Sequence, residues 1–312
     1  MDATLGEIRK RINISGTIRM NEPMSAHTTY RVGGPADFYV RPERVDDVVL
    51  LIRTAREAAI PVFVLGGGAN ILVSDRGIRG IVLDSGGFRA QHFETQSDGS
   101  TLFRVGAGLP VSDASAAAAE QGLAGMAFIY SMPGSVGGAV WMNARCYGAC
   151  IADILAYVDL VDEAGEFQHY IPREADFAYK VSPFQGRRTV IVEAGFRLTP
   201  GSTDELWQQM REVQHDRDMK GHFAAPSAGS VFKNNRDFGA PSGQIIDGLG
   251  LRGFQIGGAR VSDLHANIVQ NTGTATAADI KAVIDHIREE VRRARGFLLD
   301  PEIVLVGDWA LA

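Results

Sequence analysis

A serine and a lysine three residues apart are the first side chains in this sequence that could do chemistry together. Ser230 and Lys233 match the pattern S-x-x-K, in which a lysine helps to activate a serine nucleophile for acyl transfer. The companion motifs S-D-N and K-T-G of serine acyl-transferases are missing from the chain. The pattern is short, so it favours an acyl-transferase only weakly over a loop hydroxyl beside a surface lysine.

Glycine is the second unusual feature, since the chain contains 36 glycines and many of them stand in short runs. A residue without Cβ lets the backbone approach other backbone, or a ligand, closely. The triple glycine Gly66–Gly68 and the segment Gly134–Gly138 are two such runs. Each predicts a tight loop, either around a ligand or as a turn without one.

Several common cofactor motifs are absent from the sequence. No Gly-Lys dipeptide occurs, which excludes a Walker-type phosphate loop. Ile71 and Val111 stand where the dinucleotide fingerprint G-x-G-x-x-G requires its last glycine. No H-E-x-x-H pattern is present, and the two thiols Cys146 and Cys150 do not complete a tetrahedral zinc site. We therefore expect no metal, and small packing roles for the two cysteines.

Composition narrows the class of protein further. The 312 residues include 31 Lys and Arg against 37 Asp and Glu, so 31 − 37 gives a net charge of −6. This mild acidity argues against general binding to nucleic acid or anionic membranes. No segment approaches the roughly 18 apolar residues of a membrane span. Two cysteines cannot form a disulfide framework, which favours a reduced, cytoplasmic setting.

Strands and helices alternate around the glycine-rich loops. Apolar stretches at Val62–Leu65 and Ile71–Val73 predict buried strands on either side of the triple glycine. Near the end of the chain, Thr276 and Asp279 predict a capping box at a helix start, and Gly296 predicts its end. Breaks near residues 84 and 200 predict three consecutive parts, 1–84 with an N-terminal lead-in, 85–200 and 201–312.

Six motifs in a fixed order give the sequence its specificity, and together they resemble the UDP-N-acetylenolpyruvoylglucosamine reductase family. The resemblance runs from about Thr28 to Gly307. Each motif alone is short, but the order of all six makes chance a poor explanation. The motifs are Thr28–Ala36, Leu65–Val73, Pro133–Ala139 with Met142–Ala144, Ser227–Asn234, His265–Asn267 and Pro301–Ile303.

The resemblance implies an FAD enzyme of peptidoglycan precursor synthesis, with NADPH as the electron donor. Its substrate would be UDP-N-acetylglucosamine enolpyruvate and its product UDP-N-acetylmuramate. The fold implied is α+β, with a two-part FAD-binding region of the vanillyl-alcohol-oxidase-like (PCMH-type) kind before a C-terminal α+β substrate-binding domain. These parts correspond to residues 1–84, 85–200 and 201–312. The oligomeric state stays open, and a monomer is compatible with the sequence.

The resemblance places FAD at the two glycine-rich loops. Backbone N–H groups of such loops can point at the pyrophosphate of FAD without obstruction by side chains. For Ser135, a loop-stabilising hydroxyl is an equal alternative. The residues expected to bind FAD are Gly66, Gly67, Gly68, Ala69, Asn70, Ile71, Pro133, Gly134, Ser135, Gly137, Gly138 and Asn143.

By resemblance, three residues carry the catalytic chemistry. Hydride addition to the enolpyruvyl group spreads negative charge into the substrate carboxylate, so a proton donor and a stabilising cation are needed. Ser230 corresponds to the proton donor, and Glu302 lies by the enolpyruvyl group and helps to manage the intermediate. Lys180 stands where the family has an arginine that polarises the carboxylate; it keeps the charge and loses the bidentate fork.

Three further residues are expected to bind the substrate by the same resemblance. Tyr179 precedes Lys180, and Lys233 with Asn234 would contact the diphosphate or the enolpyruvyl region. For Lys233 a plain surface lysine is the competing interpretation.

Departures from the family pattern keep two other hypotheses open. Arg145 replaces the usual glycine after Met-Asn-Ala, Ala127 replaces an acidic residue, and Asn235 replaces a proline. With Lys180, these changes allow a catalytically impaired flavin- or nucleotide-binding paralogue, which would keep the flavin but lose turnover. A flavin oxidase of the same fold is the other alternative, and oxygen consumption without the UDP-sugar would favour it.

Overall fold

The computed structural model describes residues 14–309, in which helices and sheets are mixed as the α+β class requires. By their internal packing the described residues form two compact units. Unit 1 consists of the described residues up to Asn21, Asp37–Gly67 and Gly80–Gln214. Unit 2 consists of Glu22–Ala36, Gly68–Arg79 and the residues from His215 onward. Two short segments of the N-terminal third thus pack with the C-terminal part of the chain.

The first sheet of unit 1 has the strand order β1-β2-β5-β3, and its β3–β5 pair is parallel, with Val62 opposite Ile81. Helix α2 (Val45–Glu57) buries the face that carries Val48 and Leu51, because apolar residues recur along it at helical spacing. The strands of this sheet are β1 (Gly16–Pro23), β2 (Pro35–Pro42), β3 (Val62–Leu65) and β5 (Ile78–Asp84).

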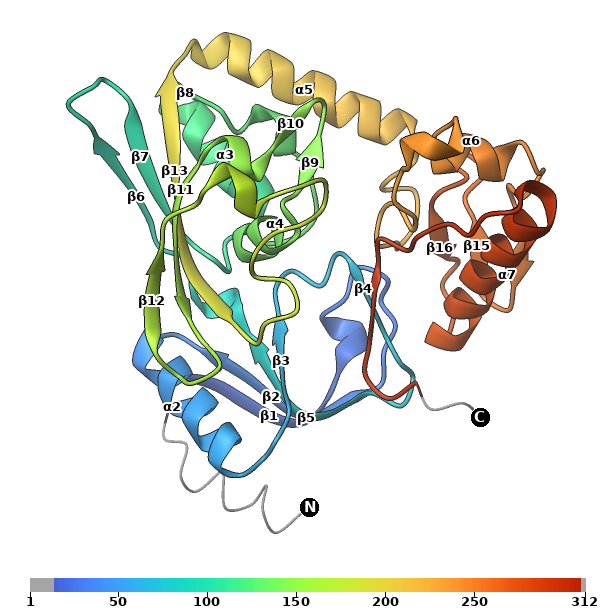
Figure 1. Ribbon diagram of the computed structural model, residues 1–312, viewed down its shortest axis with the longest axis horizontal. Helices are drawn as coiled ribbons and strands as arrows, with labels where there is room; N and C mark the ends of the chain where they lie inside the picture. The colour runs from blue at the N-terminus through green and yellow to red at the C-terminus, as the bar shows by residue number, and fades with distance from the viewer. Residues whose placement is uncertain (1–13, 310–312) are drawn as a thin grey trace. The chain divides into compact units, whose positions relative to one another are not determined.

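The second sheet of unit 1 is antiparallel, in the order β12-β11-β13-β7-β6, with β8 added along β13 (Figure 1). Its core includes Phe103 and Phe196, which are fully buried. Helices α3 (Val111–Glu120) and α4 (Val136–Met142) bury apolar residues in the same core. The strands are β6 (Gln91–Thr95), β7 (Thr101–Gly106), β8 (Leu123–Ala124), β11 (Leu155–Val161), β12 (Phe167–Tyr170) and β13 (Val190–Pro200).

A two-stranded ribbon and helix α5 lie outside these two sheets. A short antiparallel ribbon joins β9 (Arg145–Cys146) to β10 (Ala149–Cys150), with Cys146 opposite Ala149. Helix α5 (Thr203–Met219) begins directly after β13, where the sequence predicted a boundary at Pro200.

In unit 2, helix α7 (Ala277–Arg295) packs along a small antiparallel sheet of β14, β15 and β16 (Figure 1). Ile280, Ile284 and Ile287 on one face of α7 lie in its core. A separate parallel pair joins β4 to the last strand, with Leu72 opposite Leu305. The remaining elements are β4 (Ile71–Val73), α6 (Ser242–Asp247), β14 (Gln255–Ile256), β15 (Ala259–Val261), β16 (Val269–Asn271) and β17 (Val304–Val306).

The ends of α7 confirm the local sequence signals. Thr276 accepts a hydrogen bond from the Asp279 amide and donates its own amide to the Asp279 carboxylate, both at 3.0 Å. Gly296 ends the helix in the left-handed region with φ of 81°. One partner was not predicted: the Asp75 carboxylate accepts from the amides of Ala277 at 2.8 Å and Ala278 at 2.9 Å.

The predicted division into 1–84, 85–200 and 201–312 stays a prediction, and the packing units follow the three-dimensional contacts instead. Part of the predicted lead-in, residues 1–13, lies outside the described residues. Between residues 14 and 309, no helix has the length and apolar character needed to cross a membrane.

Candidate active site

The two glycine-rich loops predicted to hold FAD lie against each other within unit 1. A Cβ atom on Gly67 would stand 2.6 Å from the Cα of Gly134, and one on Gly66 would stand 2.6 Å from the Ser135 hydroxyl oxygen. No side chain fits at either contact, so the glycines are required by the approach of the two loops. Loops without side chains can present backbone N–H groups to a pyrophosphate. The glycines of both loops therefore fit FAD.

Ser135 begins helix α4 and stabilises its own loop. Its hydroxyl oxygen accepts a hydrogen bond from the Gly138 amide at 3.2 Å, and the Gly137 amide donates to the carbonyl of Ala107 at 2.8 Å. The sequence placed these residues in a loop, whereas the structure starts a helix at Val136. A contact between Ser135 and FAD stays a prediction.

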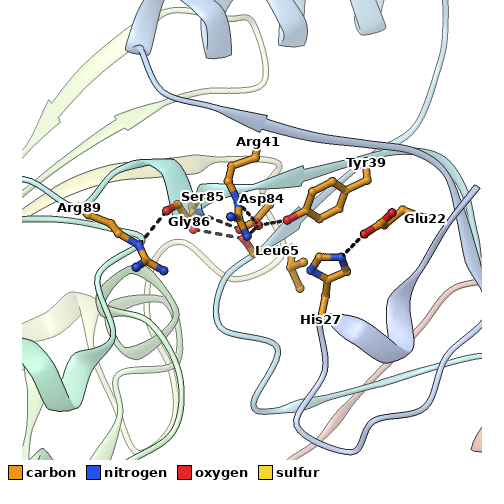
Figure 2. Close-up of polar contacts among 9 residues, drawn as sticks. All are labelled: Glu22, His27, Tyr39, Arg41, Leu65, Asp84, Ser85, Gly86 and Arg89. Atoms are coloured by element: carbon orange, nitrogen blue, oxygen red, sulfur yellow. Dashed lines mark hydrogen bonds and ion pairs between the residues drawn. The ribbon is translucent and has the colours of Figure 1, made fainter. Parts of the chain in front are cut away.

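A turn next to the triple glycine was missed from the sequence (Figure 2). The Ser85 hydroxyl donates to the carbonyl of Leu65 at 3.2 Å, directly before Gly66. The Asp84 carboxylate is buried and accepts from the Gly86 amide and from the Arg41 guanidinium, each at 2.7 Å. This turn therefore fixes the start of the loop predicted to bind FAD. An acidic residue at the end of an apolar strand was the sequence signal for it.

Tyr39 is the third partner of the Asp84 carboxylate in this cluster (Figure 2). Burial, reinforced by Asp84, raises the pKa of the Tyr39 hydroxyl, so Tyr39 is a neutral donor here. The buried carboxylate thus has three partners, one of them the Arg41 guanidinium that pairs its charge, and the cluster supports the turn.

Lys180 lies in a tight turn in which Ala178 and Val181 exchange two backbone hydrogen bonds, of 3.2 and 3.1 Å. Its φ of 58° is in the left-handed region, which non-glycine residues adopt at a cost. Asn143 donates to the Ala178 carbonyl at 2.9 Å, and Gln185 donates to the Lys180 carbonyl at 3.1 Å. The structure thus connects Asn143, predicted for the flavin wall, to the turn of Lys180 and the exposed Tyr179.

Ser230 and Glu302 lie on neighbouring extended segments of unit 2. The Glu302 amide donates to the carbonyl of Val231 at 2.7 Å, and the Lys233 amide donates to the carbonyl of Asp300 at 2.9 Å. The segments that carry the two residues predicted to handle the proton are therefore paired through their main chains, with Val231 opposite Glu302. Ser230 itself is paired across to Ile268.

The side chains around this pair have partners of their own. The Lys233 ammonium forms an ion pair with Asp300 at 2.9 Å, and Asn234 accepts from the Ser242 amide at 2.9 Å. Asn70 donates to the carbonyl of Glu302 at 3.0 Å. Substrate binding by Lys233 and Asn234 stays a prediction, and so does FAD binding by Asn70.

The remaining predicted FAD residues flank these contacts. Gly68 has φ of 63°, and a Cβ there would lie 2.0 Å from the carbonyl oxygen of His27. Ile71 follows Ala69 and Asn70 and opens β4, where it pairs with Val304. Pro133 precedes Gly134 in the facing loop.

The cysteines make separate local contacts. The Cys146 sulfur lies 2.8 Å from the Phe128 carbonyl oxygen, the Cys150 sulfur lies 3.1 Å from the Asp153 carboxylate, and neither cysteine forms a disulfide. Burial raises the pKa of Cys150. Over the part of the chain that the structure describes, no group of three or more His, Cys, Asp or Glu residues could hold a metal ion.

Comparison with known proteins adds two family-model matches. The C-terminal domain of UDP-N-acetylenolpyruvoylglucosamine reductase matches residues 221–306, and an FAD binding domain matches residues 36–170. These matches agree with the predicted order of a flavin-binding region followed by a substrate domain.

Individual relatives extend the similarity to nearly the whole chain. The reductase of Treponema pallidum is 38% identical over 96% of each chain, and that of Heliobacterium modesticaldum is 39% identical over 94% of this chain and 92% of its own length. The solved structure of the Thermus caldophilus reductase superposes with a TM-score of 0.77 at 30% identity, covering 94% of this chain and 99% of that one.

Proposed function

Since the chain belongs to the UDP-N-acetylenolpyruvoylglucosamine reductase family, we propose that it reduces its substrate with NADPH as donor and with Ser230 as proton donor. It is an FAD-dependent oxidoreductase of peptidoglycan synthesis. Its substrate is UDP-N-acetylglucosamine enolpyruvate, and a nicotinamide nucleotide is the reductant. When bound, FAD supplies the two-electron chemistry that links the nicotinamide to the enolpyruvyl group.

The observation that carries the proposal is the pairing of the Ser230 and Glu302 segments through the 2.7 Å hydrogen bond between Glu302 and Val231. As hydride adds to the terminal carbon of the enolpyruvyl group, negative charge spreads into the substrate carboxylate. The Ser230 hydroxyl then delivers a proton to the adjacent carbon, and Glu302, on the segment paired with that of Ser230, shares that proton.

The ammonium of Lys180 stabilises the carboxylate as charge develops on it. Gly66, Gly67 and Gly134 hold FAD through backbone groups, and Asp84 supports their loop. We further propose that the enzyme works in the cytoplasm, which its two cysteines without a disulfide support.

NADPH oxidation by the purified protein, with and without the enolpyruvyl UDP-sugar, tests the proposal. Substrate-dependent oxidation with a lactyl product supports it. Flavin reduction by NADPH without substrate-dependent reoxidation identifies an impaired paralogue, and oxygen consumption without the UDP-sugar identifies an oxidase.

Ser230→Ala separates the role of Ser230 from the overall activity. The variant should be reduced by NADPH at the wild-type rate, because its flavin loops are unchanged. Reoxidation by substrate should fall by about 10²- to 10⁴-fold, the range typical of a lost proton donor. Wild-type reoxidation in Ser230→Ala would remove Ser230 from the mechanism.

A further inference from the structure

One buried amide side chain holds the backbone that follows Ser230. Asn267 is 4% exposed. Its Oδ1 accepts from the Phe232 amide at 3.0 Å, and its Nδ2 donates to the Phe232 carbonyl at 2.8 Å. A single side chain thus satisfies both main-chain groups of Phe232, as a neighbouring strand otherwise would.

The preceding residue, Val231, is held from both sides by main chain. Its amide donates to the Asn267 carbonyl at 2.8 Å, and its carbonyl accepts from the Glu302 amide at 2.7 Å. All four polar main-chain groups of Val231 and Phe232 therefore have partners, and both residues are at most 1% exposed. One of these four bonds joins the segment to Glu302, and the other three join it to Asn267 and hold it in place.

The orientation of Asn267 is itself determined. Reversing its amide would place two donors together at the Phe232 amide and two acceptors together at its carbonyl. The Asn267 main-chain amide donates to Nδ1 of His265 at 3.2 Å. That nitrogen must be unprotonated to accept, and burial lowers the pKa of His265, which favours the neutral ring.

We propose that Asn267 is a positioning residue for proton delivery: its side chain fixes the Ser230–Phe232 segment against Glu302 without touching the substrate. The inference rests on the proposed function, because it assumes that Ser230 is the proton donor. It assigns a role to the motif His265–Asn267, for which the sequence offered none.

The chain offers a matched control in Asn271, which is also 4% exposed. Its Nδ2 donates to the Tyr30 carbonyl at 2.9 Å, and its Oδ1 accepts from the Gly273 amide at 2.8 Å. Its side chain therefore bridges main-chain groups in the same way as that of Asn267, but its partners do not include the segment after Ser230. Asn267→Asp and Asn271→Asp are expected to weaken unit 2 alike.

The test is rapid-mixing kinetics of the two half-reactions under anaerobic conditions, for the FAD-loaded full chain and both variants. Asn267→Asp should be reduced by NADPH within about twofold of wild type. Its reoxidation by the enolpyruvyl UDP-sugar should be about 10- to 100-fold slower, because the donor to the Phe232 carbonyl becomes a repelled oxygen. Asn271→Asp should leave both half-reactions near wild type.

A pH profile adds a readout that a purely structural role would not move. A protonated carboxyl at position 267 regains one donor and one acceptor, so reoxidation in Asn267→Asp should recover toward wild type as the pH falls. His265 contacts Asn267 directly, and Lys233, Asp300 and Glu302 lie on the paired segments, so the wild-type profile is measured alongside to account for them. If Asn267→Asp fails to fold, Asn267→Ser takes its place in the half-reactions.

Equal reoxidation rates in Asn267→Asp and wild type would overturn the inference alone. Equal slowing of both half-reactions in the two variants would also overturn it, since that result reports loss of folded protein. A wild-type enzyme that is not reoxidised by substrate would overturn the proposed function, and this inference with it.

Discussion

At the scale of single residues, Lys180 is unusual both in its residue type and in its backbone conformation. The sequence singled it out as a lysine in place of an arginine, and its backbone occupies the left-handed region with φ of 58°. Asn143 and Gln185 hold the backbone of this turn through the Ala178 and Lys180 carbonyls, and a strained backbone held in this way is typical of a functional constraint. Because the backbone is held in this way, the activities of variants that differ in the end of the side chain at position 180 can be compared directly.

Lys180→Arg should raise kcat by up to about tenfold, because the guanidinium binds a carboxylate through two parallel hydrogen bonds. Lys180→Met should lower kcat by about 10²- to 10³-fold, as expected when a donor to developing charge is removed. Steady-state rates with the enolpyruvyl UDP-sugar measure both. An active Lys180→Met would show that Lys180 does not stabilise the carboxylate.

His222 is the residue whose titration should be visible in the stability of the protein. Burial, helped by Arg217, His265 and Lys220 and opposed by Asp216, lowers its pKa from 6.5 to about 4. Between pH 6.5 and about 4, His222 binds a proton more tightly in the unfolded chain than in the folded one. Its contribution to the free energy of unfolding is therefore fully present above pH 6.5 and is lost as the pH falls toward 4.

Replacing His222 with glutamine should therefore reduce the acid sensitivity of folding. Urea unfolding midpoints at pH ~7 and ~4.5 would be compared for wild type, His222→Gln and the control His92→Gln on an exposed strand. The midpoint should fall less in His222→Gln than in wild type. An unchanged difference between the two pH values would mean that His222 is not the acid-sensitive group.

At the scale of elements, contacts between loops that are far apart in the sequence contribute to the structure as well as the strands beside them. The glycines of Gly66–Gly68 follow a strand that the sequence predicted correctly. What the loop packs against, the segment from Gly134, is far away in the sequence. The same holds for α7, whose capping box is local while its additional partner Asp75 comes from another part of the chain.

Gly67→Ala tests the contact between the two loops. Its Cβ would stand 2.6 Å from the Cα of Gly134, so the loops must separate, at a cost of about 1–3 kcal/mol. The dissociation constant of FAD should rise by roughly tenfold or more. Gly248→Ala is the control, since the nearest atom to its Cβ is a carbonyl at 3.3 Å. Flavin fluorescence titration measures both, and unchanged affinity in Gly67→Ala would contradict the cradle.

At the scale of the whole molecule, the residues predicted to bind FAD and those predicted to handle the proton belong to different packing units. The loops of Gly66–Gly67 and Gly134, predicted to bind FAD, lie in unit 1, and Ser230 and Glu302 lie in unit 2. Sequence patterns show one pair of flavin loops and no separate nicotinamide fingerprint. NADPH and the enolpyruvyl substrate are therefore expected to use one site in turn.

This arrangement predicts ping-pong kinetics. Double-reciprocal plots of rate against NADPH, at several fixed substrate concentrations, should give parallel lines. The flavin should also be reduced by NADPH at full rate when the enolpyruvyl UDP-sugar is absent. Intersecting lines would indicate a ternary complex and a second binding site.

The sequence by itself determined the family, the glycine-rich loops, the strands beside them and the capped helix α7. Those features follow from signals within a few residues: periodicity, caps and the absence of Cβ atoms. The tertiary structure alone decided that the segment of Ser230 pairs with that of Glu302, that the turn of Asp84 and Ser85 supports the loop predicted to bind FAD, and that the Asn267 side chain bonds both main-chain groups of Phe232. Such pairings join segments far apart in the chain, and they depend on how the core packs, which no local pattern encodes.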